Sequence, residues 1–525
     1  MSVYSVIPIK RPRRSLFYLN HPVNTSCNIG ELIPTCRPIE CVPGDTFDVS
    51  QVATCELMPM IKPAKGNLWL ESWCFFVSND MLKINSDSGK FTEILLSAQN
   101  PRDVLSLPKI IGQNNSPWFS LGHILDYLGY PVGVGTNVSG LSLTPYPVRG
   151  YFKIFDEYFR DENLQSETFT PLYGVPVDGA IQLVNYKKDR FTSAFTSEQK
   201  GSPISLGLGT SAPVTITTKM LQNGTLYDGS FITVPPKNTE LNAFSVGYQT
   251  QDGTITGDIP YGDIQFNATA DLSSATAVTI NDLRLANKLQ KWSERIQLAG
   301  SRPKEYLLAN YGICPNDETL QRPVLIGHIK TPVIIDSVVQ NIPTSGSVAS
   351  TKSGNGYTVS KTRFGKWTCK EFGWIYVLSA LRPDSVYTQG IHRSLIKNNI
   401  YDFFNPVFES LGQQEILNAE LFARNTLADK EIWGFTDRYN EYRAMEGMTT
   451  GALRANVQES LDPWVIQRKF AELPTLSSSF IQVNPSEYDY LFNFQHSESR
   501  PQAILHCANF IKAIRPISKY AHPSL

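Results

Sequence analysis

Short runs of β-branched and aromatic residues, each bounded by turn-forming residues, recur along this chain of 525 residues. They read DTFDVSQVATCELM (45–58), NLWLESWCFFVSND (67–80), PVLIGHIKTPVIIDSVVQ (323–340) and KEFGWIYVLSALRPD (370–384). Runs of this length and composition are typical of β-strands. Because long connections with helical patterns separate the runs, we predict a mainly β fold, an antiparallel β-sandwich or jelly roll with elaborated loops.

One connection, PVRGYFKIFDEYFRDENLQ (147–165), carries a stripe of large apolar side chains. They recur every three or four residues, which predicts an amphipathic helix of about five turns with one buried face. On the other face, the pairs Lys153–Glu157 and Asp156–Arg160 are four residues apart, which favours ion pairing along a helix. These local cations keep the acidic residues ionised, so the pattern favours packing over general acid–base catalysis. The stripe consists of Val148, Tyr151, Phe152, Phe155, Tyr158 and Phe159.

A second helix is predicted over TINDLRLANKLQKWSERIQLAG (279–300). Its apolar residues Leu285, Leu289, Trp292, Ile296 and Ala299 alternate in spacings of four and three. Thr279 or Asn281 is a suitable N-cap, and Gly300 follows directly after the last periodic residue. A shorter helix is predicted to begin at Pro303 and to end at Gly312.

The remaining organisation follows from composition. Residues 1–42 are interrupted by proline and are expected to form an extended N-terminal arm, followed by a single domain over 43–525. Residues 202–278 are poor in charge and rich in Gly, Thr, Ser and Asn, which indicates an inserted β-rich surface segment. Residues 343–362 are expected to be a flexible polar loop with a hairpin turn at Asn355-Gly356.

The formal net charge of −1 excludes a generally basic nucleic-acid-binding surface, so any such contact must use local patches. No run of about 18 apolar residues occurs and the N-terminus lacks the apolar region of a signal peptide, so we expect a soluble chain made in a cytoplasm, without a membrane span. The eight cysteines form no CxxC pair and do not match zinc-ligand spacings with His21, so buried reduced thiols are expected.

Motifs of catalysis are missing from the sequence. It contains no GxSxG, HExxH or EF-hand pattern, and no two of its seven histidines have a metal-ligand spacing. We therefore assign no catalytic residue, no cofactor and no metal site, and we expect that the protein is not an enzyme.

Two basic clusters near the chain ends are candidates for contact with DNA. Phosphate groups bind such clusters with release of counterions, and exposed rings nearby offer stacking surfaces for bases. A solvated terminus with incidental charge explains the same pattern equally well. The candidate cations are Lys10, Arg11, Arg13, Arg14, Lys512, Arg515 and Lys519, and the candidate rings are Tyr4, Phe17 and Tyr18.

Ten segments together resemble the major capsid protein of the Microviridae, small icosahedral single-stranded DNA phages, in particular the gokushovirus-like group. The order and spacing of the segments match over nearly the whole chain. They are PGDTFDV (43–49), LWLESWCFFVSNDML (68–82), GHILDYLGYPVGV (122–134), residues 147–165, DRFTSAFTSEQKG (189–201), TINDLRLANKLQKWSER (279–295), YGICPNDETLQRPVLIG (311–327), YTQGIHR (387–393), WGFTDRYNEYR (433–443) and IRPISKY (514–520).

The resemblance implies an eight-stranded jelly roll that assembles through pentamers into a T=1 icosahedral shell around a circular single-stranded DNA genome. It places a protrusion at the threefold axes in the insertion Ser202 to Val278, where contact with a host cell-surface receptor is expected. It also implies a small basic DNA-packaging protein, a minor pilot protein and a scaffolding protein as partners, and an arm whose Arg11, Arg13 and Arg14 face inward. The protein would be made in the host bacterial cytoplasm and end up in the virion capsid.

A shell subunit buries large apolar surfaces against identical copies. The aromatic stripe is therefore expected to pack on the jelly roll or on a neighbouring subunit, with Asp156 and Arg160 as surface or interface ion pairs. A soluble β-sandwich that binds carbohydrate or acts in adhesion is the alternative, motivated by loops rich in Tyr and Trp, and a hydrolase has the least support. The candidates for packing between subunits are Tyr151, Phe152, Phe155, Tyr158, Phe159 and Trp292.

Overall fold

The structure is a computed structural model of the full chain. It describes residues 13–96 except 86 and 88, 108–111, 117–169 except 131, 133–139 and 141, 179–201, 280–341 except 301, and 349–520 except 410 and 456. Between 201 and 280 it describes only four short strands. The chain divides into two compact units, one of Met1–Glu198 with Ala299–Leu525 and one of Gln199–Leu298.

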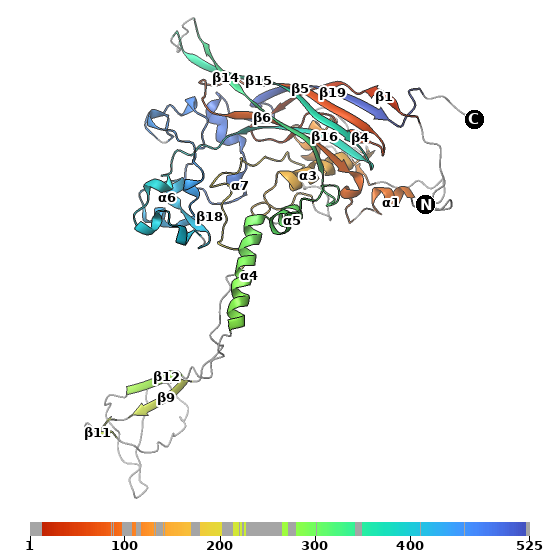
Figure 1. Ribbon diagram of the computed structural model, residues 1–525. Helices are drawn as coiled ribbons and strands as arrows, with labels where there is room; N and C mark the ends of the chain where they lie inside the picture. The colour runs from red at the N-terminus through yellow and green to blue at the C-terminus, as the bar shows by residue number, and fades with distance from the viewer. Residues whose placement is uncertain are drawn as a thin grey trace, which may run out of the picture. The chain divides into compact units, whose positions relative to one another are not determined.

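The first unit contains two antiparallel sheets that lie face to face (Figure 1). The six-stranded sheet has the order β1 (Ser15–Tyr18), β19 (Ala503–Arg515), β5 (Thr46–Leu57), β15 (Lys352–Thr368) and β14 (Ile334–Val339), with β2 (His21–Cys27) also paired to β19. The five-stranded sheet has the order β13 (Val324–Pro332), β6 (Leu68–Ser78), β16 (Gly373–Pro383) and β3 (Ile33–Pro34), with β4 (Ile39–Cys41) also paired to β16. The predicted strand regions and the mainly β fold are confirmed, whereas the eight-stranded jelly-roll connectivity stays a prediction.

The central strand β6 is buried on both faces because it lies between two layers. Its residues Cys74 and Phe76 belong to a core cluster shared with Phe47 and Ile511 of the six-stranded sheet. Its alternate residues Trp73 and Phe75 belong to a second cluster with helix α3 (Tyr146–Tyr158). Strand β6 therefore reads as a nearly continuous apolar run, and α3 forms the third layer of the body (Figure 1).

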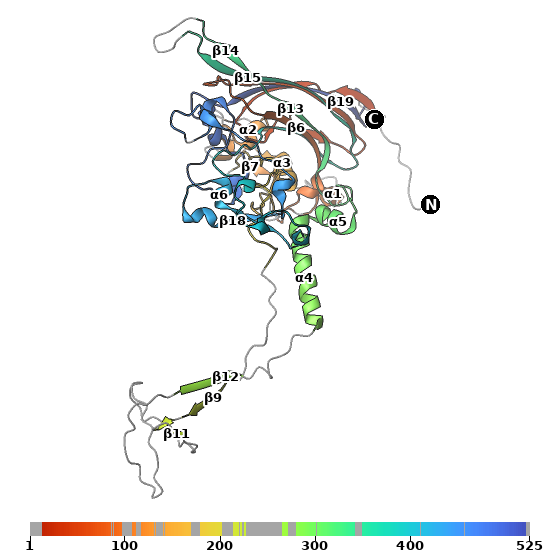
Figure 2. The same cartoon turned by 60° about the vertical axis from the view of Figure 1, so that its left-hand side comes forward.

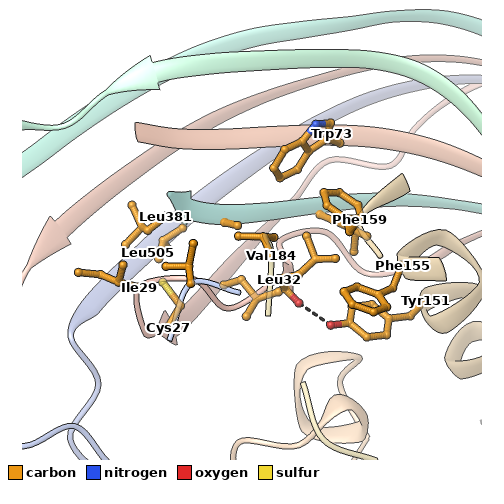
Figure 3. Packing of buried hydrophobic residues seen from close by; sticks show 14 of the residues in the cluster. Cys27, Ile29, Leu32, Trp73, Tyr151, Phe155, Phe159, Val184, Leu381 and Leu505 are labelled. Carbon is orange, nitrogen blue, oxygen red and sulfur yellow. Dashed lines mark hydrogen bonds between the residues drawn. The ribbon is translucent and has the colours of Figure 1, made fainter. Parts of the chain in front are cut away.

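The aromatic stripe of α3 is buried in this chain's own core. Phe155 and Phe159 are 2% and 8% exposed, and the ring of Phe159 lies edge-on to Trp73 with 4.9 Å between the ring centroids (Figure 3). The hydroxyl of Tyr151 donates a hydrogen bond of 2.8 Å to the carbonyl of Leu32. The stripe therefore packs on the β-sandwich, which was one of the two expected positions.

Gly150, in the middle of α3, permits this close packing. A Cβ atom at this position would lie 2.1 Å from the hydroxyl oxygen of Tyr376, a fully buried residue of β16. Glycine lowers helix stability, so its presence here is explained by the close approach of helix and sheet.

The prediction that α3 continues to residue 165 is wrong, because the helix ends at Tyr158. Beyond it, side chains bind backbone groups that a longer helix would need for its own hydrogen bonds. The Asp161 carboxylate accepts hydrogen bonds from the backbone N–H of Asn163 and Leu164, and the Gln165 side chain accepts one from the N–H of Asp161. Such local bonds compete with helix formation.

The expected ion pair between Asp156 and Arg160 is present, but it does not lie on the surface of the chain. Their side chains are 7% and 10% exposed and lie 3.6 Å apart within the body of the chain. The Asp156 carboxylate accepts hydrogen bonds from the backbone N–H groups of Thr168 and Phe169, so it holds the following loop in place. Burial is the main cause that raises the pKa of Asp156 above its ordinary value.

The N-terminal arm is extended, but in its described part it is regular β-structure rather than irregular chain. Strands β1 and β2 pair with β19, and β3 and β4 pair with β16, so the arm spans both sheets. Proline is tolerated in β2 and β3 because they are short strands at the sheet margins.

The expected flexible loop at 343–362 is mostly strand. Residues 352–362 belong to β15, Asn355 pairs with Asp336 of β14, and the predicted turn at Asn355-Gly356 is therefore wrong. The glycines are explained by close contacts, because a Cβ at Gly354 would lie 2.6 Å from the carbonyl oxygen of Lys62, and one at Gly356 would lie 2.4 Å from the Leu57 side chain. Residues 342–348 lie outside the described part. Strands β14 and β15 extend past the rest of the sheet (Figure 2).

The two predicted helices are present as α4 (Ile280–Ala299) and α5 (Pro303–Tyr311), and Gly300 and Gly312 follow them in left-handed conformations. Asn281 lies inside α4 and is not its N-cap, and Thr279 lies outside the described residues. The insertion contains β9 (Val214–Lys219), β10 (Leu221–Gln222), β11 (Thr225–Leu226) and β12 (Gln265–Ala270), in agreement with its expected β character.

Short elements complete the described chain. The helices are α1 (Phe91–Leu96), α2 (Ile124–Tyr127), α6 (Asn418–Leu421) and α7 (Ser478–Ile481), and the strands are β7 (Ile110–Ile111), β8 (Ser142–Leu143), β17 (Gln414–Leu417) and β18 (Ile432–Thr436). Single 3-10 segments lie at Asn79–Leu82, Pro117–Phe119, Arg393–Leu395, Ile400–Asp402, Pro406–Phe408, Leu427–Lys430, Asn440–Tyr442, Gly451–Leu453, Asp462–Trp464 and Pro485–Leu491. All eight cysteines are free thiols, and all but Cys314 are buried, as expected for reduced thiols.

Candidate nucleic-acid interface

The fold brings the two basic clusters of the sequence to one edge of the six-stranded sheet. Strand β1 is antiparallel to β19, with Ser15 opposite Arg515 and Tyr18 opposite Lys512. Arg13 and Arg14 directly precede β1 and are exposed. Lys10 and Arg11 lie outside the described residues. Cations almost 500 residues apart in sequence are thus neighbours in the sheet.

The C-terminal cations do not form a solvated tail. Lys512 and Arg515 belong to β19, an internal strand of the sheet. The signal that the sequence analysis missed is the recurrence of apolar residues at alternate positions, interrupted by Asn509: Ala503, Leu505, Cys507, Ile511 and Ala513. Lys512 is exposed, and so is Lys519 beyond the strand. Arg515 is already occupied, because its guanidinium pairs with Asp45 at 2.9 Å and donates to the carbonyl of Glu40.

Three further cations on β15 face the same side as Lys512, and the sequence analysis did not single them out. Only Lys361 lies in the part of this strand that was expected to be a loop. Strand β5 runs between β19 and β15, and the register aligns Lys512, Asp48 and Lys366 in one row across the sheet. The next row contains Phe510, Ser50 and Arg363, and Lys361 follows one row further. We call this surface the basic sheet face, and its residues are Tyr18, Lys361, Arg363, Lys366, Phe510 and Lys512.

Asp48 orders the centre of the basic sheet face. The Arg363 guanidinium donates two hydrogen bonds to its carboxylate, with N–O distances of 3.0 Å and 2.8 Å. These bonds, together with the positive charges of Arg363, Lys512 and Lys366, hold the pKa of Asp48 below its ordinary value. The carboxylate therefore stays ionised at neutral pH. It pairs with Arg363, so it does not pair with Lys366 or Lys512, the two lysines in its own row.

Aromatic rings lie among these cations. Tyr18 and Phe510 are 63% and 47% exposed, and each is adjacent to Lys512, Tyr18 across the strand pair and Phe510 two residues along β19. Phe17 points the other way and packs on the core between the sheets. Exposed rings beside lysine and arginine are the combination with which proteins bind single-stranded nucleic acid, because bases stack on the rings and phosphates contact the cations.

The charge on this side of the sheet is uneven along the strands. The cations are concentrated near the C-terminal ends of β19 and β15. Glu56 and Asp336 lie toward the opposite ends of these strands, near Tyr357. A polyanion therefore meets a favourable potential only over the basic part of the sheet.

The candidates for packing between subunits fall into two groups. Tyr151, Phe152 and Phe155 are at most 2% exposed and are enclosed by residues of the same chain, and Tyr158 and Phe159 pack on Phe75. Their position therefore leaves little surface for a neighbour. Trp292 of α4, in contrast, is 53% exposed.

A second uncovered surface lies in residues 391–448, which we call the apolar lobe. Buried ion pairs fix its backbone: Lys397 pairs with Glu441 at 3.0 Å, and Arg393 pairs with Glu420 at 2.7 Å. So many exposed large apolar side chains in one segment are characteristic of a surface that contacts another molecule. Its exposed apolar residues are Ile391, Leu395, Ile400, Tyr401, Phe403, Phe404, Val407, Leu411, Leu427, Ile432, Tyr442, Met445 and Met448.

The described residues also contain a charged pocket of about 340 Å³ lined by Asp156, Glu157, Arg160, Glu162, Glu167, Arg302 and Pro303. Its arginines are bound to neighbouring groups, since Arg302 pairs with Glu162 at 2.6 Å and donates to the carbonyl of Asp156. Within the described ranges, no three His, Cys, Asp or Glu side chains are placed to hold a metal ion. Over the same ranges, no helix is long and apolar enough to cross a membrane.

A β-sandwich with a cationic, aromatic sheet face and many uncovered apolar side chains belongs to the class of proteins whose surfaces, rather than a catalytic pocket, are the candidate functional sites. The family described as "Capsid protein (F protein)" matches residues 5–525. The chain belongs to this capsid protein family, and the resemblance to the major capsid proteins of the Microviridae is confirmed.

Three relatives have similar sequences along most of their length. Capsid protein VP1 of Bdellovibrio phage phiMH2K is 31% identical, with 92% of this chain and 90% of the relative aligned. Capsid protein VP1 of Chlamydia phage 1 is 28% identical over 99% of this chain and 97% of the relative. Capsid protein VP1 of Spiroplasma virus 4 is 26% identical over 98% and 95%. The chain is thus a structural protein of a virion capsid.

Proposed function

We propose that this chain is the major capsid protein that assembles, through pentamers, into a T=1 icosahedral shell around a circular single-stranded DNA genome. The observation that carries the proposal is the coexistence, in a member of a capsid family, of the basic sheet face and the apolar lobe. The first surface suits an enclosed polyanion and the second suits contact with identical copies.

The apolar lobe supplies the attraction between subunits. Leu395 and Val407 are 78% and 79% exposed and stand on a backbone fixed by buried ion pairs, so they are presented without rearrangement. Interfaces of permanent assemblies are apolar and large, like a domain core divided in two. Neighbouring subunits therefore cover this surface when the chain is part of a shell.

The basic sheet face contacts the genome. Its cations neutralise phosphates and its two rings accept stacked bases, without reading a particular sequence. Arg13 and Arg14 extend the same surface at the β1 edge. A small basic packaging protein, a minor pilot protein and a scaffolding protein are the proposed partners in the particle and its assembly in the host bacterial cytoplasm, and no catalytic role is proposed.

The insertion Ser202 to Val278 is the proposed site of contact with a host cell-surface receptor, as a protrusion at the threefold axes. It is poor in charge and rich in small polar residues, a composition that suits a variable surface segment. Its described strands β9 and β12 pair with each other, which gives the segment local structure of its own.

Electron microscopy of the expressed full chain, with its scaffolding partner, tests the proposal. Closed shells are expected from the natural sequence, and a chain with Leu395→Asp and Val407→Asp is expected to stay folded by circular dichroism but to form no shells. The matched control, Leu395→Met with Val407→Ile, keeps the surface apolar and is expected to assemble. A natural chain that remains monomeric contradicts the proposal, and glycan binding by that monomer would support an adhesion module instead.

A further inference from the structure

Helix α4 presents an uncovered apolar seam. Leu285, Leu289 and Trp292 are 60%, 41% and 53% exposed, and Ile296 continues the same line with part of its side chain accessible. The spacings from 285 to 299 are four, three, four and three residues, which is the heptad alternation that places side chains on one line of a helix. The helix is continuous over this length (Figure 1).

The helix needs a partner to be stable. Of its 20 residues, only Gln297 is buried. Most of the stability of protein helices comes from packing of an apolar face, and an isolated helix of this length is marginal in water. An apolar seam on such a helix is therefore a docking surface whose occupant has to be identified.

The residues that flank the seam suit a second copy of the same helix. In the heptad with Leu285 and Trp292 at position d and Leu289 at a, the e positions are Ala286 and Ser293, and the g positions are Lys288 and Arg295. Parallel helices oppose e with g of the partner, so a small neutral residue always faces each cation and no like charges meet. On the outer face of the helix, polar side chains bind each other, since Gln290 donates a 2.9 Å hydrogen bond to Glu294.

We propose that α4 forms a parallel, in-register coiled coil with α4 of neighbouring copies of this chain. This inference rests on the proposed function, because a closed symmetric shell brings identical helices together around a rotation axis and keeps them parallel when they run along it. The helix directly follows the insertion in sequence, so the bundle joins the proposed receptor-contacting segments of neighbouring subunits.

Disulfide trapping in assembled particles tests the bundle. All variants are made in a Cys314→Ser background, because Cys314 is the one exposed native thiol. Particles with Leu285→Cys, and separately with Leu289→Cys, are oxidised and run on a non-reducing gel. Both cysteines face their own copies in a parallel bundle, close enough to bridge, so a covalent dimer of this chain is expected as the major product.

Asn287→Cys is the matched control, because position 287 lies on the opposite side of the helix from the seam and is equally open to the oxidant. It is expected to remain monomeric on the gel. Shells that form normally but give no more dimer with Leu285→Cys and Leu289→Cys than with Asn287→Cys overturn the bundle and leave the proposed function intact. Particles can also be assembled from a mixture of Leu285→Cys and Ile296→Cys chains. If the introduced thiol at position 285 of one chain links only to the thiol at position 296 of another, the helices are antiparallel and the proposed parallel arrangement is wrong. Absence of particles in the Cys314→Ser background contradicts the proposed function itself.

Discussion

Neutralising the basic sheet face is expected to lower the salt dependence of binding to single-stranded DNA. The change is the replacement of Lys361, Arg363, Lys366 and Lys512 by glutamine, which removes four exposed positive charges from one surface without touching the core. If each cation contacts one phosphate, the slope of log K against log salt falls by roughly 0.7 per contact, or about 2.8 for four contacts. Arg363 is already hydrogen bonded to Asp48. If it therefore contacts no phosphate, three contacts remain and the slope falls by about 2.1, which is the smallest change we expect.

The assay is fluorescence anisotropy of a labelled oligo-dT with the unassembled full-length chain, repeated over a series of salt concentrations. The control chain carries glutamine at Lys65, Lys187, Lys430 and Lys469, four exposed lysines outside the strands of this sheet, so its net charge is the same as that of the test variant. An equal loss of slope in both variants would show that binding depends on total charge, and would refute the assignment of this surface.

Three further predictions concern the same surface and the helix behind the second sheet. Phe510→Ala should weaken oligo-dT binding by about 1–3 kcal/mol in the same anisotropy assay while leaving the salt slope unchanged, because it removes stacking and no charge. Asp48→Asn should strengthen binding at pH 7 by releasing Arg363. Because Arg363 lowers the pKa of Asp48, the natural chain should gain this extra affinity only at a pH below the range in which an ordinary Asp is protonated, and the variant should show no such gain. Gly150→Ala should lower the free energy of unfolding by about 1–3 kcal/mol in urea titration, since its Cβ overlaps Tyr376, and an unchanged midpoint would contradict the packing described.

Elements with a strong local signal could be predicted from the sequence. Strands β5, β6, β13 and β16 are rich in β-branched and aromatic residues, and α4 and α5 have regular apolar spacing and a glycine stop. In each case the local preference and the tertiary environment agree, so the sequence pattern alone was sufficient.

Strand β15 could not be predicted, because its structure depends on contacts with distant residues. Gly354 and Gly356 suggest a turn when read locally, but they are required by the close approach of Lys62 and Leu57. One cation of the candidate interface, Lys361, was missed for this reason, since it lies in the part of β15 that was read as a loop. The length of α3 was overestimated because helical spacing does not show that Asp161 binds the backbone beyond it.

The position of β19 has a consequence for how the chain matures. This strand lies in the middle of the six-stranded sheet, between β5 and the strands β1 and β2, yet it comes last in sequence among the described strands. Strands β1 and β2 are synthesised hundreds of residues before their partner β19, and until then β5 also lacks its neighbour on that side. Only a chain translated through β19 can therefore complete this sheet, so a product that ends before this strand leaves β5 with an unpaired edge.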